Sequence, residues 1–346
     1  MFSCGNMLDM KMNEEVKLRN HEPKSHEGNP CSDPGQESPL VGQKSPVVGL
    51  LGQNDAPPSS PTLVFPIFEP DVHVARGSVA DQVAWLHARA FPHRFKLVYL
   101  DPPFYSNKDY GAFSDQWPSL PDYLHEIKGW LTSINPWIHD GGFLVLHCDY
   151  HASHYLKVMG DEIFGYANFR NEWVWHYTGR RTPASLQVNS KHDVLLVWAK
   201  SPAARMNPVY DDWKRDDYVS MKKQKVHRDE GGREWIWGHQ GRGKSHAYRI
   251  YLDEHVARGR AIDTVWDIPI INTSAKERLG YPTQKPVALL KRVIALTTNA
   301  DDWVADFACG SGTTGAAAVS MGRRVWLGDQ TPEAVQITQK RLSESR

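Results

Sequence analysis

Cysteine is scarce in this sequence of 346 residues, and the four cysteines form no metal-binding or disulfide pattern. Cys4, Cys31, Cys148 and Cys309 include no Cys-x-x-Cys pair and no Cys/His spacing typical of a zinc site. The sequence therefore predicts no metal site. It suits a reducing compartment, in which cysteines stay unpaired.

Net charge and long apolar runs are lacking as well. Lys and Arg together number 40, as do Asp and Glu, so the formal net charge is +0 and no general affinity for polyanions is expected. A nucleic-acid partner would require positive charge that is concentrated locally. No stretch reaches the roughly 18 continuous apolar residues of a membrane span, and the N-terminus lacks the apolar core of a signal peptide. These absences predict a soluble, cytoplasmic protein without a membrane partner.

Aromatic residues are missing from the first 62 residues except for Phe2. This stretch is crowded with Pro, Ser, Gly, Asn, Lys and Glu. Such a composition buries too little apolar surface to offset the entropy of ordering the chain. We therefore expect residues 1–62 to form a disordered N-terminal tail.

From about residue 63, apolar runs alternate with helical patterns. The expected strands are 95–100, 143–147, 192–199, 303–307 and 325–328, and the expected helices are 80–91, 121–138, 286–298, 313–321 and 332–342. A turn at Asp140-Gly-Gly is expected before the second strand. Strands that alternate with helices predict an α/β fold with a mostly parallel sheet.

The tetrapeptide Asp101-Pro102-Pro103-Phe104 follows the apolar run 95–100. It predicts a stiff loop at the carboxyl end of a buried strand, where ligands bind in sheets flanked by helices. The carboxylate can accept a hydrogen bond from an amino group, and the prolines fix the direction of the neighbouring carbonyl. The Phe104 ring offers a face on which a base can stack. A lone Asp-Pro-Pro is equally compatible with an ordinary turn.

A glycine-rich turn, Asp306-Phe-Ala-Cys-Gly-Ser-Gly-Thr-Thr-Gly315, ends one expected strand and opens a helix. Its glycines allow close approach of a ligand, and the helix N-terminus presents free N–H groups. The next strand ends 23 positions after Asp306, at Asp329, where an acid can hydrogen-bond ribose hydroxyls. The Gly-x-Gly-x-x-Gly match also fits a nicotinamide dinucleotide site. That alternative requires a permuted fold, because only 34 residues follow Gly312, and no catalytic partner is visible for an oxidoreductase.

Together the two motifs resemble those of the DNA amino-methyltransferases, which transfer a methyl group from S-adenosylmethionine to an exocyclic amine. The family's catalytic motif, Asp/Asn/Ser-Pro-Pro-aromatic, is matched at residues 101–104. Its cofactor motif, Asp-Pro-Phe-x-Gly-x-Gly-Thr, is matched at residues 306–313, with Phe307 and Ala308 replacing Pro and Phe. Tyr281-Pro-Thr-Gln-Lys-Pro286 resembles the segment that, in relatives, meets the methionine carboxylate. The catalytic motif comes first and the cofactor motif last, as in the β-class of these enzymes.

The resemblance implies a Rossmann-like methyltransferase fold with helices on both faces of the sheet and a permuted motif order. It implies a catalytic half at residues 63–199, a cofactor-binding half at 261–346 and an inserted target-recognition segment at 200–260. That segment holds 14 Lys/Arg against 9 Asp/Glu, interleaved with aromatics, which favours DNA contact over a merely solvated insertion. Double-stranded DNA is the expected partner. Some relatives are dimers, so a homodimer is an expectation, and a partner restriction endonuclease is left open.

The resemblance also implies roles for residues. Asp101 and the Pro102 carbonyl accept the two hydrogens of the target amine, and a base flipped out of the duplex stacks on Phe104. The expected cofactor-binding residues are Asp306, Cys309, Gly310, Ser311, Gly312, Thr313, Asp329, Thr283, Gln284 and Lys285. The expected DNA-binding residues are Lys222, Lys223, Lys225, Arg242 and Lys244. No covalent intermediate is needed, and Cys309 is expected to serve packing rather than chemistry.

The target base is only partly specified. Asp at the first motif position is typical of relatives that act on adenine N6, whereas Ser is commoner for cytosine N4, so adenine is favoured and cytosine stays open. A methyltransferase of RNA or protein remains an alternative, against which the motif order and the basic insert weigh. A DNA-binding module without catalysis is another, but Asp101, the glycine loop and Asp329 are all present.

Overall fold

The computed structural model describes residues 71–179, 188–239 and 247–344. The predicted tail, residues 1–62, lies outside these ranges, as do Arg242 and Lys244. Within the described ranges, every helix is too short or too polar to cross a membrane.

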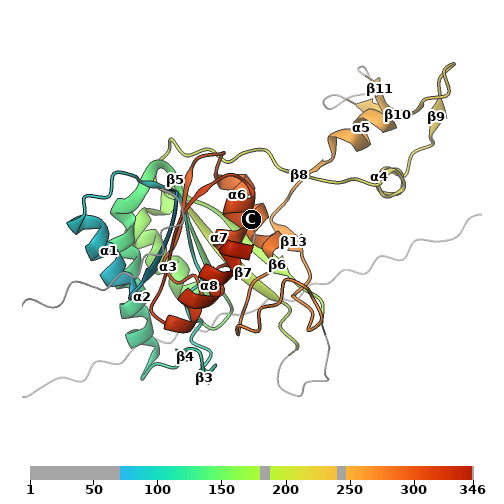
Figure 1. The fold of residues 1–346 in the computed structure, drawn as a ribbon. Coiled ribbons are helices and arrows are strands. Elements are labelled where there is room, and N and C mark those ends of the chain that lie inside the picture. The colour runs from blue at the N-terminus through green and yellow to red at the C-terminus, as the bar shows by residue number, and fades with distance from the viewer. Residues whose placement is uncertain (1–70, 180–187, 240–246, 345–346) are drawn as a thin grey trace, which may run out of the picture. The chain divides into compact units, whose positions relative to one another are not determined.

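An eight-stranded sheet forms the centre of the fold (Figure 1). Its strands are β1 (Val72–Arg76), β2 (Phe95–Leu100), β5 (Ile138–Cys148), β6 (Phe169–His176), β7 (His192–Ala199), β13 (Val265–Asp267), β14 (Trp303–Asp306) and β15 (Arg324–Asp329). They lie in the order β1-β15-β14-β2-β5-β7-β6-β13. Neighbouring strands run parallel, except that β7 lies antiparallel between β5 and β6. The predicted α/β fold with a mostly parallel sheet is confirmed.

Helices cover both faces of this sheet (Figure 1). One apolar layer joins the sheet to α1 (Val79–Ala88), α2 (Leu120–Ile134) and α3 (Ser153–Phe164). The other joins it to α6 (Val287–Thr297), α7 (Thr313–Ser320) and α8 (Pro332–Glu344). Because both faces are covered, the central strands are apolar throughout rather than alternating, which is why they are visible as continuous runs in the sequence.

The expected helix 121–138 and the expected turn at Asp140-Gly-Gly are both wrong in detail. Helix α2 ends at Ile134 and continues as a 3₁₀ turn over Asn135–Trp137, because Pro136 cannot donate the next helical hydrogen bond. Strand β5 then begins at Ile138, so Gly141 and Gly142 lie inside it rather than in a turn. A Cβ on Gly142 would stand 2.8 Å from the carbonyl oxygens of His139 and Lys96. This close approach accompanies an irregular register between β2 and β5.

Several elements of the core, among them β1, β13 and α3, are absent from the strands and helices expected from the sequence. Strand β1 has only five residues, and pairs with β15 at the edge of the sheet. Helix α3 starts after Ala152, whose side chain provides no capping hydrogen bond. A short edge strand and a helix without a start signal both lack the local patterns on which sequence interpretation depends.

The segment between β7 and β13 contains a small body with its own apolar cluster. Its elements are β8 (Tyr210–Asp211), α4 (Arg215–Lys222), β9 (His227–Arg228), β10 (Glu234–His239), β11 (Ala247–Tyr251), α5 (Leu252–Arg258) and β12 (Arg260–Ala261). Strands β9, β10 and β11 form an antiparallel sheet, and Tyr218, Ile236 and Leu252 are buried together. Strands β8 and β12 pair with each other, so the chain enters and leaves this body side by side.

The contact between α3 and β7 supplies a test of core packing. A Cβ on Gly160 would stand 2.3 Å from the Trp198 ring, and Trp198 is fully buried. We expect Gly160→Ala to lower the free energy of unfolding by about 1–3 kcal/mol, because overpacking a core forces side chains and backbone to shift. The change is measured by urea denaturation.

Gly129 on α2 is the matched control. It is exposed, and a Cβ placed there would meet no atom of the described residues within 4 Å beyond its own helix backbone and chain neighbours. Gly129→Ala should therefore raise the free energy of unfolding, by about 0.5–1 kcal/mol, through helix propensity alone. Equal effects of the two substitutions would contradict the packing inferred for Gly160.

Candidate active site

Three carboxylates lie at the carboxyl ends of three adjacent parallel strands. Asp101 follows β2, Asp306 is the last residue of β14, and Asp329 is the last residue of β15. All three line one pocket, which also includes Pro102, Pro103 and Phe104. The two predicted motifs, some 200 residues apart in the sequence, therefore meet at one site.

Asp101 has one oxygen bonded and one free. Its Oδ2 atom accepts a hydrogen bond from Lys285 Nζ at 2.6 Å, and the two groups form an ion pair. Its Oδ1 atom is buried and has no hydrogen-bond partner among the residues that the structure describes. A buried acceptor without a donor costs roughly 1–3 kcal/mol. The site is thus prepared for a ligand that brings an N–H or O–H group to this atom.

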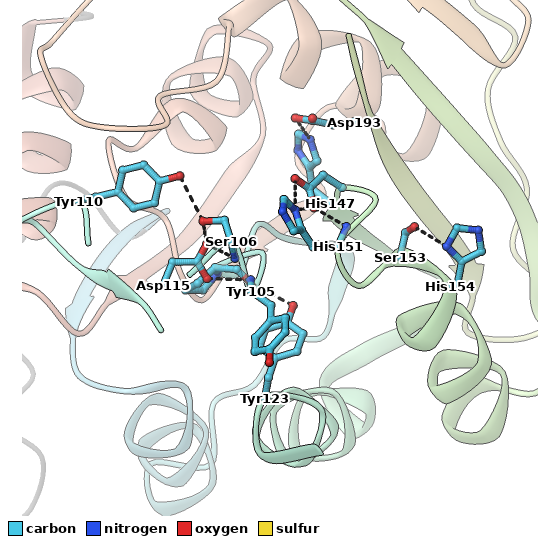
Figure 2. A network of polar contacts seen from close by, with 12 residues as sticks. Tyr105, Ser106, Tyr110, Asp115, Tyr123, His147, His151, Ser153, His154 and Asp193 are labelled. Atoms are coloured by element: carbon cyan, nitrogen blue, oxygen red, sulfur yellow. Dashed lines mark hydrogen bonds and ion pairs between the residues drawn. The ribbon is translucent and has the colours of Figure 1, made fainter. Parts of the chain in front are cut away.

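The loop after Asp101 is held from two sides (Figure 2). The Tyr123 hydroxyl, on α2, donates to the Pro103 carbonyl at 3.0 Å. Asp115 accepts from the backbone N–H groups of Tyr105 at 2.7 Å and Ser106 at 3.0 Å, and from the Ser106 hydroxyl at 2.5 Å. Tyr105 has φ 63, in the left-handed region that non-glycine residues rarely adopt. Asp115 therefore stabilises a strained loop whose shape orients Phe104.

Phe104 contributes an aromatic face beside the ion pair. Its ring centroid lies 4.9 Å from Lys285 Nζ and 5.5 Å from the ring of His147. A cation at this distance is attracted to the ring electrons, which keeps Lys285 near both Asp101 and Phe104. The predicted stacking surface is in the pocket, next to the free oxygen of Asp101.

The glycine loop between β14 and α7 is tied to the end of β15. Gly310 N–H donates to Asp329 Oδ2 at 2.9 Å, and Asp329 Oδ1 accepts from the backbone and hydroxyl of Thr331. Gly310 has φ 49 and Gly312 has φ 70, so both adopt the left-handed conformation that favours glycine. A Cβ on Gly312 would stand 2.6 Å from Thr338 Oγ1. Gly310 lines the pocket, whereas Gly312 packs behind it against α8.

Burial changes the acidity of the carboxyl groups in this loop. Desolvation raises the pKa of Asp306 to about 7, although Thr314 and the Ala308 N–H donate hydrogen bonds to it. Desolvation also raises the pKa of Asp329 above its ordinary value. Both groups lose hydration without gaining a cationic partner from the residues that the structure describes, so a positively charged ligand in the pocket would favour their ionised forms.

Cys309 lies inside the same loop and is buried. Burial raises the pKa of its thiol well above the ordinary value, and its sulfur lies 3.6 Å from Thr338 Oγ1. A neutral thiol that packs against a hydroxyl is a poor nucleophile. The geometry agrees with a packing role.

The segment Thr283-Gln284-Lys285 lines the pocket, but its side chains point to different partners. Gln284 accepts from Leu279 N–H and donates to the Glu277 carbonyl, so it closes the loop that precedes α6. Lys285 contacts Asp101, and its carbonyl accepts from the Thr313 hydroxyl at 3.1 Å. Thr313 also receives a bond from the buried Arg341, at 2.8 Å, and lines the pocket with Ser311. Lys285 therefore links the two motifs directly.

Several pocket residues are missed by reasoning from the sequence. Gly77 and Ser78, after β1, and the aromatic residues Tyr110, Phe113 and Tyr281 all line the pocket. Phe113 lies on the hairpin of β3 (Lys108–Asp109) and β4 (Ser114–Asp115), and its ring stacks on Tyr281 with centroids 6.4 Å apart. Isolated aromatics in loops carry no distinguishing pattern, so only the folded chain brings them together.

The buried pair His147 and Asp193 is also missed, although it carries a signal. Each is a buried polar residue that adjoins an apolar run, residues 143–146 in β5 and residues 194–199 in β7. Buried polar residues are uncommon and usually have a partner. His147 Nε2 lies 3.2 Å from Asp193 Oδ2, and His147 Nδ1 lies 3.7 Å from Asp101 Oδ1.

The predicted DNA-binding lysines lie outside the pocket. Lys222 is the last residue of α4, Lys223 follows it with φ 50, and Lys225 lies in the next turn; all three are exposed. Arg242 and Lys244 belong to the residues that are not described. In the described part of the chain, no group of three or more His, Cys, Asp or Glu side chains could hold a metal ion.

Comparison with known proteins gives consistent results. A DNA methylase family model matches residues 95–340. The StyLTI Mod subunit of a type III restriction-modification enzyme from Salmonella typhimurium is 23% identical over 301 residues, which cover 65% of this chain and 46% of that protein. The DNA adenine methyltransferase YhdJ of Escherichia coli is 23% identical over 230 residues, which cover 66% of this chain and 69% of that protein. The chain thus spans less than half of the length of the Salmonella protein.

One solved structure extends the comparison to the fold. The PvuII DNA methyltransferase, described as cytosine-N4-specific, has a TM-score of 0.51 at 16% identity. The match covers 78% of this chain and 86% of that one. The two proteins share the fold.

The loop that carries Phe104 can be tested through Asp115. Asp115→Asn replaces one of the two acceptor oxygens by an NH₂ donor, so at least one of the two loop N–H groups is left without an acceptor. We expect a loss of about 1–3 kcal/mol in the free energy of unfolding, measured by urea denaturation. Asp109→Asn, in the same hairpin, is the control, because exposed Asp109 accepts only the Gly111 N–H bond among the hydrogen bonds found in the described hairpin. Comparable losses of stability in both variants would argue against a specific role of Asp115 in holding the loop after Asp101.

Proposed function

Because the chain belongs to the DNA methylase family of N6/N4 methyltransferases, we propose that it methylates the N6 amine of adenine in double-stranded DNA, with S-adenosylmethionine as methyl donor. The observation that carries this proposal is the buried, unpartnered Oδ1 atom of Asp101, which lies in the pocket beside an aromatic face. Asp rather than Ser at this position favours adenine over cytosine. Cytosine N4 is the alternative target within the same family.

The residues of the pocket fit S-adenosylmethionine by the chemistry of their donors and acceptors. Gly310 leaves room at the loop, since a Cβ there would stand 3.0 Å from the Tyr281 ring. Asp306 and Asp329 offer carboxylates to a ligand that carries a sulfonium, an ammonium and ribose hydroxyls. The aromatic rings of Tyr281 and Phe113 offer apolar surface to an adenine ring. When bound, S-adenosylmethionine supplies an electrophilic methyl group.

An exocyclic amine of a base is a weak nucleophile, because its lone pair is delocalised into the ring. Asp101 Oδ1 accepts one amine hydrogen and the Pro102 carbonyl accepts the other, so the nitrogen becomes more tetrahedral and its lone pair becomes available. Lys285 holds the carboxylate in orientation through Oδ2. Most of the acceleration then comes from positioning and from charges that are fixed before the reaction.

The target amine is not accessible inside a duplex, so the base has to be flipped out and stacked, and Phe104 supplies the face for it. The body between β8 and β12 supplies groups for holding the DNA. Lys222, Lys223 and Lys225 are exposed there, and Trp237 and Tyr248 are 40% and 50% exposed on neighbouring strands. Cations that contact phosphates and aromatics that contact bases are the usual means of binding nucleic acid.

The proposal is tested by expressing the chain in a bacterial host without adenine-N6 or cytosine-N4 methylation. The host DNA is then sequenced by a method that distinguishes the two modified bases. We expect N6-methyladenine in one recurring sequence, and none in cells that carry Asp101→Ala, which removes both carboxylate oxygens and with them the acceptor for the amine hydrogen. Asp301→Asn, at a position with 83% exposure, is the control and should methylate normally. N4-methylcytosine would correct the target base, and the absence of both modifications would contradict DNA as the substrate.

A second prediction concerns the raised pKa of Asp306. Below pH 7 its carboxyl group is mostly protonated, because its pKa is about 7. A bound cation favours the ionised form and lowers this pKa, so binding of S-adenosylmethionine at pH 6–7 should release a proton, whereas at pH 9 the group is already ionised. Calorimetric titrations in two buffers of different ionisation enthalpy measure the number of protons released.

The control for this titration is Asp306→Asn, which keeps the bond from Ala308 N–H and still offers a polar group to Thr314. This variant should bind S-adenosylmethionine more weakly, and the binding should release no proton between pH 6 and 7. An unchanged proton release in this variant would assign the effect to another group, such as Asp329.

A further inference from the structure

His147 is a buried histidine that the proposed reaction has not yet used. It lies near the end of β5, and its side chain has no exposed surface. Nδ1 lies 2.7 Å from the Tyr99 hydroxyl, and Nε2 lies 3.2 Å from Asp193 Oδ2. Figure 2 shows the ring in contact with Asp193. Burial of this polar ring is tolerated because both of its nitrogens have hydrogen-bond partners.

The partners of the ring define where its hydrogen lies. Asp193 also accepts a hydrogen bond from the Tyr177 hydroxyl at 3.0 Å. Although burial alone raises it, the hydrogen bond with His147 and the charge of Lys285 hold the pKa of Asp193 below its ordinary value. Since an ionised carboxylate can only accept, Nε2 has to carry a hydrogen. In the neutral ring, Nδ1 is then the acceptor, and it receives the hydroxyl hydrogen of Tyr99.

The same Nδ1 atom faces the free oxygen of Asp101. The distance from Nδ1 to Asp101 Oδ1 is 3.7 Å, and a shift of about 1 Å brings the two atoms to hydrogen-bond distance. Lys285 occupies the other oxygen of Asp101, Oδ2. The oxygen left for the amine is therefore the one that can pass a hydrogen to His147.

Methylation leaves one proton too many on the amine. The nitrogen lone pair forms the new N–C bond, the C–S bond breaks with its electrons left on sulfur, and the positive charge moves to the nitrogen. That charge is lost when one N–H hydrogen leaves as a proton, and Asp101 Oδ1 is the acceptor in contact with it. We infer, on the basis of the proposed function, that His147 takes this proton from Asp101 at Nδ1, and so acts as a positioning residue that returns Asp101 to its ionised form.

The surroundings of His147 suit a ring that gains a proton. The charged or titratable groups that face it are Tyr99 and Asp101 from β2, Asp193 from β7, and, one contact further out, Tyr177 after β6 and Lys285 before α6. Asp193 becomes the counter-charge of the imidazolium, and the Tyr99 hydroxyl turns from donor to acceptor. The rings of Phe104 and Trp175 lie 5.5 Å and 5.8 Å away, and the side chain of His147 has no exposed surface. The proton thus passes from Asp101 to a ring that is not in contact with solvent.

The test compares the wild type with His147→Gln in single-turnover methyl transfer to DNA between pH 5.5 and 9, so that product release does not mask the chemical step. Glutamine keeps polar atoms in the pocket but cannot take up a proton. We expect the rate to fall about 100-fold, the usual scale for losing a proton acceptor, with the affinity for S-adenosylmethionine unchanged by calorimetry. The pH dependence of the rate should differ between the wild type and His147→Gln, because only the histidine ring can take up the proton. A merely structural histidine would lower the rate equally at every pH and keep the dependence, which would overturn the inference.

Two further measurements separate this inference from the proposed function. His125→Gln, on the exposed face of α2, is the matched control and should leave the rate and its pH dependence unchanged. Nitrogen-15 NMR of histidine-labelled protein, with His147 assigned by difference from His147→Gln, should show a neutral ring with its hydrogen on Nε2 at pH 8. This readout needs no activity, so a wild type that methylates no DNA would count against the proposed function alone. A ring with its hydrogen on Nδ1, or one that is charged at pH 8, would overturn the inference that His147 takes the proton from Asp101.

Discussion

The ion pair between Asp101 and Lys285 joins two parts of the chain that lie 184 residues apart. Asp101 follows β2 in the first half of the core, and Lys285 precedes α6 in the second half, where its carbonyl also holds Thr313 of the glycine loop. The Asp101 side chain is only 18% exposed, so its carboxylate has lost hydration and is stabilised by a cation. The pairing leaves one oxygen of Asp101 without a donor. The contact that links the two halves therefore also leaves an acceptor atom available in the pocket.

The remaining acids of the site have no such cation among the described residues. Asp306 and Asp329 end neighbouring strands, and burial raises the pKa of each. Only backbone N–H groups and hydroxyls stabilise them. A ligand that carries positive charge would supply the missing partner. The strand ends at which an ionised carboxylate is unfavourable by itself are therefore suited to a sulfonium cofactor. The helices that cover the sheet keep water from these strand ends, and the lost hydration is what raises the pKa of both carboxyl groups.

The sheet also explains why a histidine belongs to this site. The antiparallel strand β7 brings Asp193 beside His147 of β5, while the parallel neighbour β2 brings Tyr99 and Asp101 to its other side. In a purely parallel sheet β7 would run the other way, and its polar residue near the strand start would lie at the opposite edge. The change of strand direction therefore places a series of hydrogen-bonded polar groups behind the carboxylate of Asp101.

The sequence by itself determined the α/β class, the bounds of β2 and β7 and the two motifs, because buried strands, prolines and glycine turns are local patterns. It also identified Asp101, Asp306, Gly310 and Asp329 as residues of one site, because the residues of the two motifs and their order along the chain resemble those of a known family. The end of α2 at Ile134, the strand through Gly141 and Gly142, and the split roles of Gln284 and Lys285 depended on contacts between distant segments. The same holds for His147 and for the aromatic wall of Phe113 and Tyr281. Only tertiary structure decided these features, since a side chain's partner across a sheet is set by strand order and register, which no local pattern encodes.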